Sequence, residues 1–199
     1  MSINLIKKSM KKRILLLAII LVITHAKSQE VSVEKSIFGI QAGLIGLWGH
    51  NEFRMSNKLA FRTEIGLEGG FWGGSYYDST GFLLAPAIAI EPRWYYNLFK
   101  RVSKEKRIDG NSANFLSLRI NYHPNWFLIS NQDIDVISDI SIIPSWGLRR
   151  NLGQHFNFET GAGIGYIHYF ASEAGYSENE GDVIINILFK IGYKFNPKK

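Results

Sequence analysis

Polar and apolar residues alternate at every second position along several stretches of this 199-residue chain, and the polar set includes charged residues. The clearest example is the segment 59–68. Its apolar positions are Leu59, Phe61, Ile65 and Leu67, and its charged positions are Arg62, Glu64 and Glu68. Because successive side chains of a β-strand point to opposite faces, this pattern predicts strands with one apolar and one charged face. One such strand fits any half-exposed antiparallel sheet. Its repetition along the whole chain is typical of a barrel with an apolar outside and a polar inside.

The N-terminus has the layout of an export signal. The basic run 11–13 precedes an apolar run over 14–23, and Ala26 and Ser28 occupy positions −3 and −1 of a cut before Gln29. A charged region, a short apolar region and a small-residue site predict a cleaved secretory signal peptide. The apolar run is shorter than the roughly 20 residues that a membrane-spanning helix needs.

Removal of this signal changes the charge of the protein. Six of the 23 Lys and Arg residues, and none of the 17 Asp and Glu residues, lie in the predicted signal peptide, 1–28. The predicted mature domain, 29–199, therefore carries 17 basic and 17 acidic residues, and the surplus that would suggest a nucleic-acid partner disappears. The signal is complete without residues 1–9, so Met10 is an alternative start. The chain has no cysteine, which excludes disulfides, thiolate metal sites and a lipidated cysteine.

We expect the mature domain to be all-β, an eight-stranded antiparallel up-and-down transmembrane β-barrel. Six segments show clear alternation: 59–72, 82–98, 115–130, 134–148, 156–170 and 183–195. The region 36–55 holds either one long strand or two short ones. We place two there, at 37–44 and 47–54, because bacterial single-chain barrels have an even number of strands.

The connections follow from this layout. We expect periplasmic turns at 55–58, 97–114 and 150–155, and extracellular loops at 73–81, 131–133 and 171–181. The link 97–114 is long and basic. We expect its basic side chains to be solvated or, alternatively, to contact a periplasmic partner. The loop 171–181 is acidic, which indicates a solvated loop or, alternatively, divalent cations bridging to lipopolysaccharide.

The two faces of the strands are assigned by what each could enclose. Turned inward, the many aromatic residues of the apolar faces would leave the charged faces nothing to enclose, so we expect the apolar faces to contact lipid. Eight strands leave an interior that side chains just fill, and buried charges need partners. We therefore expect a non-conducting lumen with a neutral charge network of Arg62, Glu64, Glu68, Glu91, Arg93, Arg119, Asp139, Arg149, Glu159 and Lys190. The reverse arrangement, a soluble secreted barrel around an apolar ligand, stays open as an alternative.

The predicted outer face also carries aromatic residues at its ends and prolines within its strands. Aromatic residues at the predicted periplasmic ends suggest a girdle: Trp94, Tyr96, Phe156, Phe158, Tyr193 and Phe195. Prolines fall on the predicted lipid-facing positions: Pro86, Pro92, Pro124 and Pro144. Proline removes a ladder hydrogen bond, and bulges beside these residues would shift the assignment of inside and outside.

Motifs for chemistry are sparse. The glycines of the run Gly161–Gly165 alternate within a strand and precede no helix, so they make room for neighbours and do not bind phosphate. The sequence holds no HExxH, paired histidine ligands or GxSxG, and we expect no cofactor and no metal. The one constellation to consider for catalysis is His168, Ser172 and Asp182, at the outer end of the last two strands.

The whole mature chain resembles the small bacterial outer-membrane β-barrel family of the OmpA/OmpX type. The strand end Pro92–Tyr96 is similar to that of such barrels, and the last strand, Lys190–Phe195, resembles the signal read by the barrel-insertion machinery. The resemblance implies an outer-membrane location, a monomer, and contacts with membrane lipid, lipopolysaccharide and that machinery. It implies a non-enzymatic structural role or a loop-mediated binding role.

A second resemblance keeps an enzymatic alternative open. Small outer-membrane barrels that deacylate lipid A carry a Ser-His-acid set on the lipid-facing wall, which the stretch from His168 loosely resembles. In that family the serine follows the histidine by two positions, where this chain has Phe170. Ser172 therefore needs a bulge to act as the nucleophile, because a nucleophile must lie within hydrogen-bond reach of its base.

Overall fold

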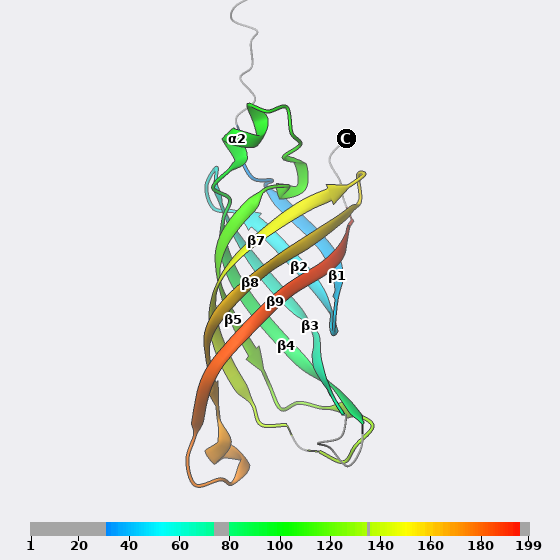
Figure 1. The fold of residues 1–199 in the computed structure, drawn as a ribbon, viewed down its shortest axis with the longest axis vertical. Helices are drawn as coiled ribbons and strands as arrows, with labels where there is room; N and C mark the ends of the chain where they lie inside the picture. Colours follow the sequence, from blue (N-terminus) through cyan, green and yellow to red (C-terminus); the bar gives the residue numbers. More distant parts are fainter. Residues whose placement is uncertain (1–30, 74–79, 135, 196–199) are drawn as a thin grey trace, which may run out of the picture. The chain divides into compact units, whose positions relative to one another are not determined.

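The computed structural model describes residues 31–73, 80–134 and 136–195, which form one antiparallel β-barrel (Figure 1). The elements are β1 Ser36–Gly43, β2 Gly46–Arg54, β3 Leu59–Trp72, β4 Gly81–Trp94, α2 Leu98–Val102, η1 Asp109–Asn111, β5 Asn114–His123, β6 Ile129–Ser130, β7 Asp139–Leu152, β8 Phe156–Tyr169, η2 Ala171–Ala174 and β9 Glu180–Lys194. Each long strand pairs with its sequence neighbour, and β1 pairs with β9, which closes the barrel. The predicted signal peptide and its cleavage site lie outside the described residues.

The eight long strands confirm the expected closed antiparallel β-barrel, including the division of 36–55 into β1 and β2. Three predicted strand bounds are wrong. The strand expected at 82–98 ends at Trp94, and the one expected at 115–130 ends at His123, because Pro124 follows without an amide hydrogen. The strand expected at 134–148 lies at Asp139–Leu152. No helix within the described ranges is long and apolar enough to cross a membrane.

Pro92 and Pro144 each lie opposite an interruption in one of the two ladders that their strand forms. The β4–β5 pairing is broken opposite Pro92, between Ile90–Ile120 and Arg93–Ser117, and the β7–β8 pairing is broken opposite Pro144, between Ile142–Tyr166 and Ser145–Gly163. In each ladder the same register holds on both sides of the break. Neither ladder therefore has a bulge beside its proline, and inside and outside do not exchange along either strand. Pro124 was expected to lie within a strand, but β5 ends at His123, one residue before it.

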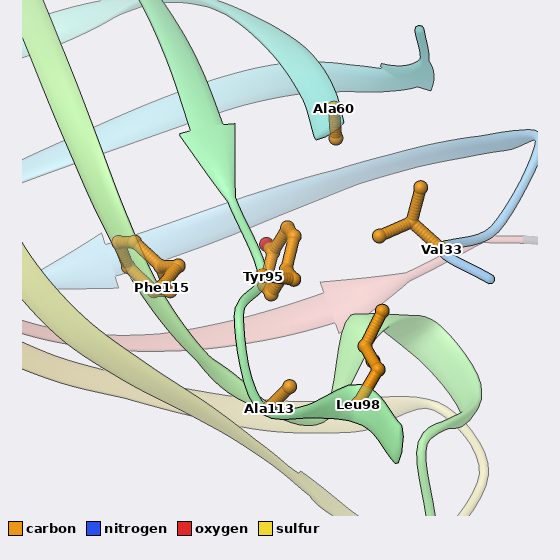
Figure 2. Packing of buried hydrophobic residues seen from close by; sticks show 6 residues of the cluster. All are labelled: Val33, Ala60, Tyr95, Leu98, Ala113 and Phe115. Carbon is orange, nitrogen blue, oxygen red and sulfur yellow. The ribbon is translucent and has the colours of Figure 1, made fainter. Parts of the chain in front are cut away.

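One end of the barrel is closed by the segment that links β4 to β5. We call this the cap end, formed by 95–113 with α2 and η1. Its apolar core contains side chains from the barrel wall, from the link and from the segment before β1 (Figure 2). These residues are Val33, Ala60, Tyr95, Leu98, Ala113 and Phe115, all fully buried. The basic side chains of the link predicted to be solvated lie on the surface or are half-buried, while its apolar residues fold over the end of the barrel.

Candidate functional site

The candidate site is the barrel interior, which a chain of ion pairs fills from the cap end toward the opposite end. All ten residues predicted for the charge network point inward, because they occupy the inner positions of β3, β4, β5, β7, β8 and β9. Each one takes part in an ion pair with another member of the network or with His123 or Glu52. Burial of so many charges is stable only because each has an opposite charge in contact.

Glu159, on β8, is the centre of the half nearer the cap. Its Oε1 accepts hydrogen bonds from Arg149 Nε at 2.6 Å and from Gln41 Nε2 at 2.9 Å. Arg62 Nη1 donates to the same oxygen at 3.2 Å, and Arg93 Nη1 donates to Oε2 at 3.0 Å. The carboxylate and its three arginines are fully buried. One carboxylate on β8 thus forms ion pairs with arginines of three other strands, β3, β4 and β7.

Glu52 joins this network to the cap, and it is absent from the set predicted from the sequence. Its carboxylate forms an ion pair with Arg149 Nη2 at 3.0 Å. It also accepts hydrogen bonds from the Tyr95 hydroxyl at 2.9 Å and from Asn111 Nδ2 at 2.5 Å. Asn111 reaches the carboxylate from η1 with a positive φ of 60°, a backbone conformation that asparagine tolerates well. The alternation His50–Glu52–Arg54 along β2 is the sequence signal that could have identified Glu52.

Glu64 organises the middle of the lumen. It accepts hydrogen bonds from Arg62 Nε at 2.6 Å and from Arg119 Nη1 at 2.5 Å, and Lys190 Nζ lies 3.0 Å from its Oε2. Lys190 Nζ also lies 3.8 Å from the centre of the Trp48 ring, a cation–π contact. These contacts join β3 to β5 and β9 through the interior.

His123 connects two carboxylates at the end of the network farthest from the cap. Its Nε2 lies 2.9 Å from Glu68 Oε2, and its Nδ1 lies 2.9 Å from Asp139 Oδ1. A protonated imidazole donates from both nitrogens, so it satisfies both acids at once. Glu68 also accepts hydrogen bonds from Trp48, Arg119 and Asn121. His123 is absent from the residues predicted for the network, although it lies four residues after Arg119 on the same face of β5.

His50 differs from the other polar side chains of the lumen. It is buried on β2, and neither ring nitrogen has a hydrogen-bond partner among the described residues. Its ring packs against Gly39 of β1. If residue 39 had a side chain, its Cβ would lie only 2.9 Å from Cε1 of His50. Within the described residues no group of three or more His, Asp or Glu side chains has the arrangement of a metal site.

The catalytic candidates are not brought together. His168 pairs with Gly181, and Asp182 pairs with Ile167, so the two side chains point to opposite faces of the β8–β9 sheet. Ser172 lies in η2, where its hydroxyl donates to Asn179 Oδ1 at 2.6 Å. The His168 ring instead contacts the Phe170 ring, with a centroid distance of 5.2 Å.

This arrangement pairs the buried charges of the lumen with one another. Each charged group of the network contacts an opposite charge, and the described part of the chain holds no nucleophile hydrogen-bonded to His168 or His123. Comparison with known proteins adds no further assignment, since no family model, curated protein or solved structure matches the chain.

Proposed function

We infer that the protein is an integral outer-membrane β-barrel with a filled polar lumen and a non-enzymatic role in the envelope, either structural or through binding by its loops. The observation that carries this proposal is the inversion of burial. Charged side chains such as Arg62, Arg93 and Glu159 are fully buried, whereas Ile65, Ile164 and Ile187 are exposed. A water-soluble barrel has the opposite arrangement, and a lipid environment stabilises this one.

The outer surface adds two supporting features. β3, β4, β7, β8 and β9 have 14 or 15 residues, longer than the roughly 9–11 residues that a tilted strand needs to cross the hydrocarbon. Aromatic side chains cluster at the cap end, with Phe156 and Tyr193 at a centroid distance of 5.3 Å and Tyr193 and Phe195 at 5.5 Å. Such a girdle is typical of a membrane interface.

The proposal places the cap end in the periplasm and the loop 170–179 outside the cell. Lipid and lipopolysaccharide surround the barrel, the insertion machinery assembles it, and the signal peptide is cut near Ser28. The proposed barrel is a monomer that does not conduct ions, because the charge network and the cap block the path through its interior. Binding partners therefore meet the exposed loops, and the chemistry of those partners is left to experiment.

Gel mobility tests this proposal directly. We expect the mature protein, refolded in detergent, to run faster before boiling than after boiling, because a closed membrane barrel resists SDS. The same sample in a planar bilayer should show no stepwise conductance. Solubility in plain buffer together with unchanged mobility would contradict the membrane assignment and favour a soluble barrel. A change in the lipid A mass profile of producing cells that depends on His168 would contradict the non-enzymatic role.

A further inference from the structure

On one side of the barrel the strands of the wall are shorter than elsewhere. β1 and β2 form a short hairpin, and β1 pairs with β9 only from Gly39–Lys194 to Gly43–Lys190. Beyond that point, residues 180–189 of β9 pair with β8 alone, and residues 69–72 of β3 pair with β4 alone. Figure 1 shows the β1–β2 tip ending partway along the barrel, while β9 and β3 continue past it. We call the interval between β9 and β3 beyond the hairpin tip the side port.

The hairpin tip has the composition of a segment in lipid. Its two turn residues are Leu44 and Ile45, where turns in water favour Gly, Asn, Asp or Pro. Three of the four most exposed large hydrophobic side chains lie around the same port: Ile187 is 71% exposed, Ile185 70% and Leu44 69%. In the proposed membrane orientation, the side port therefore opens into hydrocarbon.

An open strand edge facing hydrocarbon needs hydrogen-bonding partners. The backbone groups of β9 that point away from β8 at 183–189 have no neighbouring strand among the described residues. Unsatisfied amide and carbonyl groups are not tolerated against lipid chains, so polar groups must reach this edge. An acyl chain alone cannot supply them.

A cavity lies behind the port. It has a volume of about 370 Å³, within the range of small-molecule sites. Leu44, Ile185 and Ile187 line it toward the outside, and Glu68, Arg119 and Lys190 line it toward the lumen. The cavity thus runs from an apolar rim to buried polar groups, which is the polarity of an amphiphile.

The charges of the cavity decide the kind of head group. Arg119 Nη2 lies 3.0 Å from Glu68 Oε1, and Lys190 Nζ lies 3.0 Å from Glu64 Oε2. Both cations are therefore already paired with carboxylates. A charged head group would bring an unpaired charge into this buried site, at high cost. An uncharged group with hydroxyls or amides would instead bond the β9 edge and the network without disturbing the pairs.

We propose that the side port binds a single-chain acyl amphiphile with an uncharged polar head group, whose head lies in the cavity and whose chain leaves between Leu44 and Ile187 into the bilayer. This site rests on the proposed membrane function and gives the barrel a ligand that its loops do not contact. The occupant also completes the wall, because it covers the edge of β9 that β1 does not reach.

Single-cysteine labelling tests the site, because the chain has no native cysteine. Ile187→Cys carries a fluorophore at the port, and Ile142→Cys carries it at an exposed position of β7 whose strand is paired on both sides. The probe is a monolauroylglycerol with a nitroxide on its acyl chain, added to the labelled barrel in phosphatidylcholine nanodiscs. We expect saturable quenching at position 187 and only linear, partition-driven quenching at position 142.

Competition and a filled cavity complete the test. Unlabelled monolauroylglycerol should restore the fluorescence at position 187 at least tenfold more effectively than laurate or dodecyltrimethylammonium. Asn186→Phe, which fills the cavity, should weaken the quenching at least tenfold while the gel shift of the folded barrel is retained. Equal, non-saturating quenching at both positions would overturn the proposal, as would a dimer joined through the port. Failure to enter nanodiscs, with no gel shift, would instead refute the membrane function itself.

Discussion

The substitution Glu159→Gln tests whether the charge network stabilises the barrel. Glutamine keeps the size of glutamate and one acceptor oxygen, but it removes the charge that Arg62, Arg93 and Arg149 share. Removing one partner of a buried ion pair costs about 3–5 kcal/mol, because the remaining charge stays buried without compensation. Glu52 remains near all three arginines, at 3.0 to 3.6 Å, so we expect the lower end of that range, about 3 kcal/mol.

The free energy of unfolding is measured by urea titration in detergent micelles, with tryptophan fluorescence and gel mobility as independent probes. Glu178→Gln, on an exposed loop, is the matched control, and it should stay within about 0.5 kcal/mol of the wild type. The double variant Glu159→Gln/Arg149→Met removes an acid and a base together. We expect its loss to be smaller than the sum of the single losses, because the two groups interact directly at 2.5 Å.

Two results would refute this reasoning. A loss for Glu159→Gln no larger than that of Glu178→Gln would mean that the buried carboxylate does not hold its arginines in place. Strict additivity in the double variant would mean that Glu159 and Arg149 contribute independently, although they are in contact. Either result would leave backbone pairing and the apolar outer face as the sources of stability.

Two further predictions concern the cap and the barrel wall. Hydrogen bonds from Arg107, at 2.8 and 2.9 Å, lower the pKa of Asp109, so its contribution to cap stability is present above the ordinary pKa and is lost as the pH falls through the lowered value. Hydrogen exchange of the cap amides, corrected for intrinsic rates, should therefore rise at acid pH in the wild type and not in Asp109→Asn; identical profiles would contradict this. In β3, a Cβ at Gly66 would collide with the Leu47 carbonyl oxygen, whereas one at Gly70 meets nothing within 4 Å. Gly66→Ala should lower the urea midpoint and Gly70→Ala should not, and equal midpoints would contradict the close approach of β2 and β3.

The alternation in the sequence was sufficient to predict which charges share one face of the wall. Arg62 and Glu64 lie two residues apart on β3, and Glu91 and Arg93 do so on β4, and each pair forms an ion pair inside the barrel. Side chains at every second position of a strand share a face, so the face of a residue follows from its position along the strand without knowledge of the partner strands. Glu52 was missed because its strand is short and its alternation covers few residues.

The bounds of the strands and the cap were less predictable. Apolar residues such as Tyr95 and Leu98 continue the pattern of β4 but fold over the end of the barrel, where they pack with Val33 and Phe115. A periodic pattern does not say whether an apolar side chain contacts lipid or a plug, because both environments exclude water. The contact between Val33 and a segment more than 60 residues later exists only in the folded chain.

The sequence by itself determined a wall of strands with one apolar and one charged face, because period-two alternation is set by the geometry of each strand. The count of eight also needed the rule that such barrels have an even number of strands. Only the tertiary structure decided which charges meet across the lumen, how the cap closes one end, and where the short strands β1 and β2 leave the side port. Glu159 contacts arginines from three other strands, and the β1–β2 tip stops short of residues 180–189 of β9. These relations depend on the register and curvature of all the strands together, which no single segment of the chain encodes.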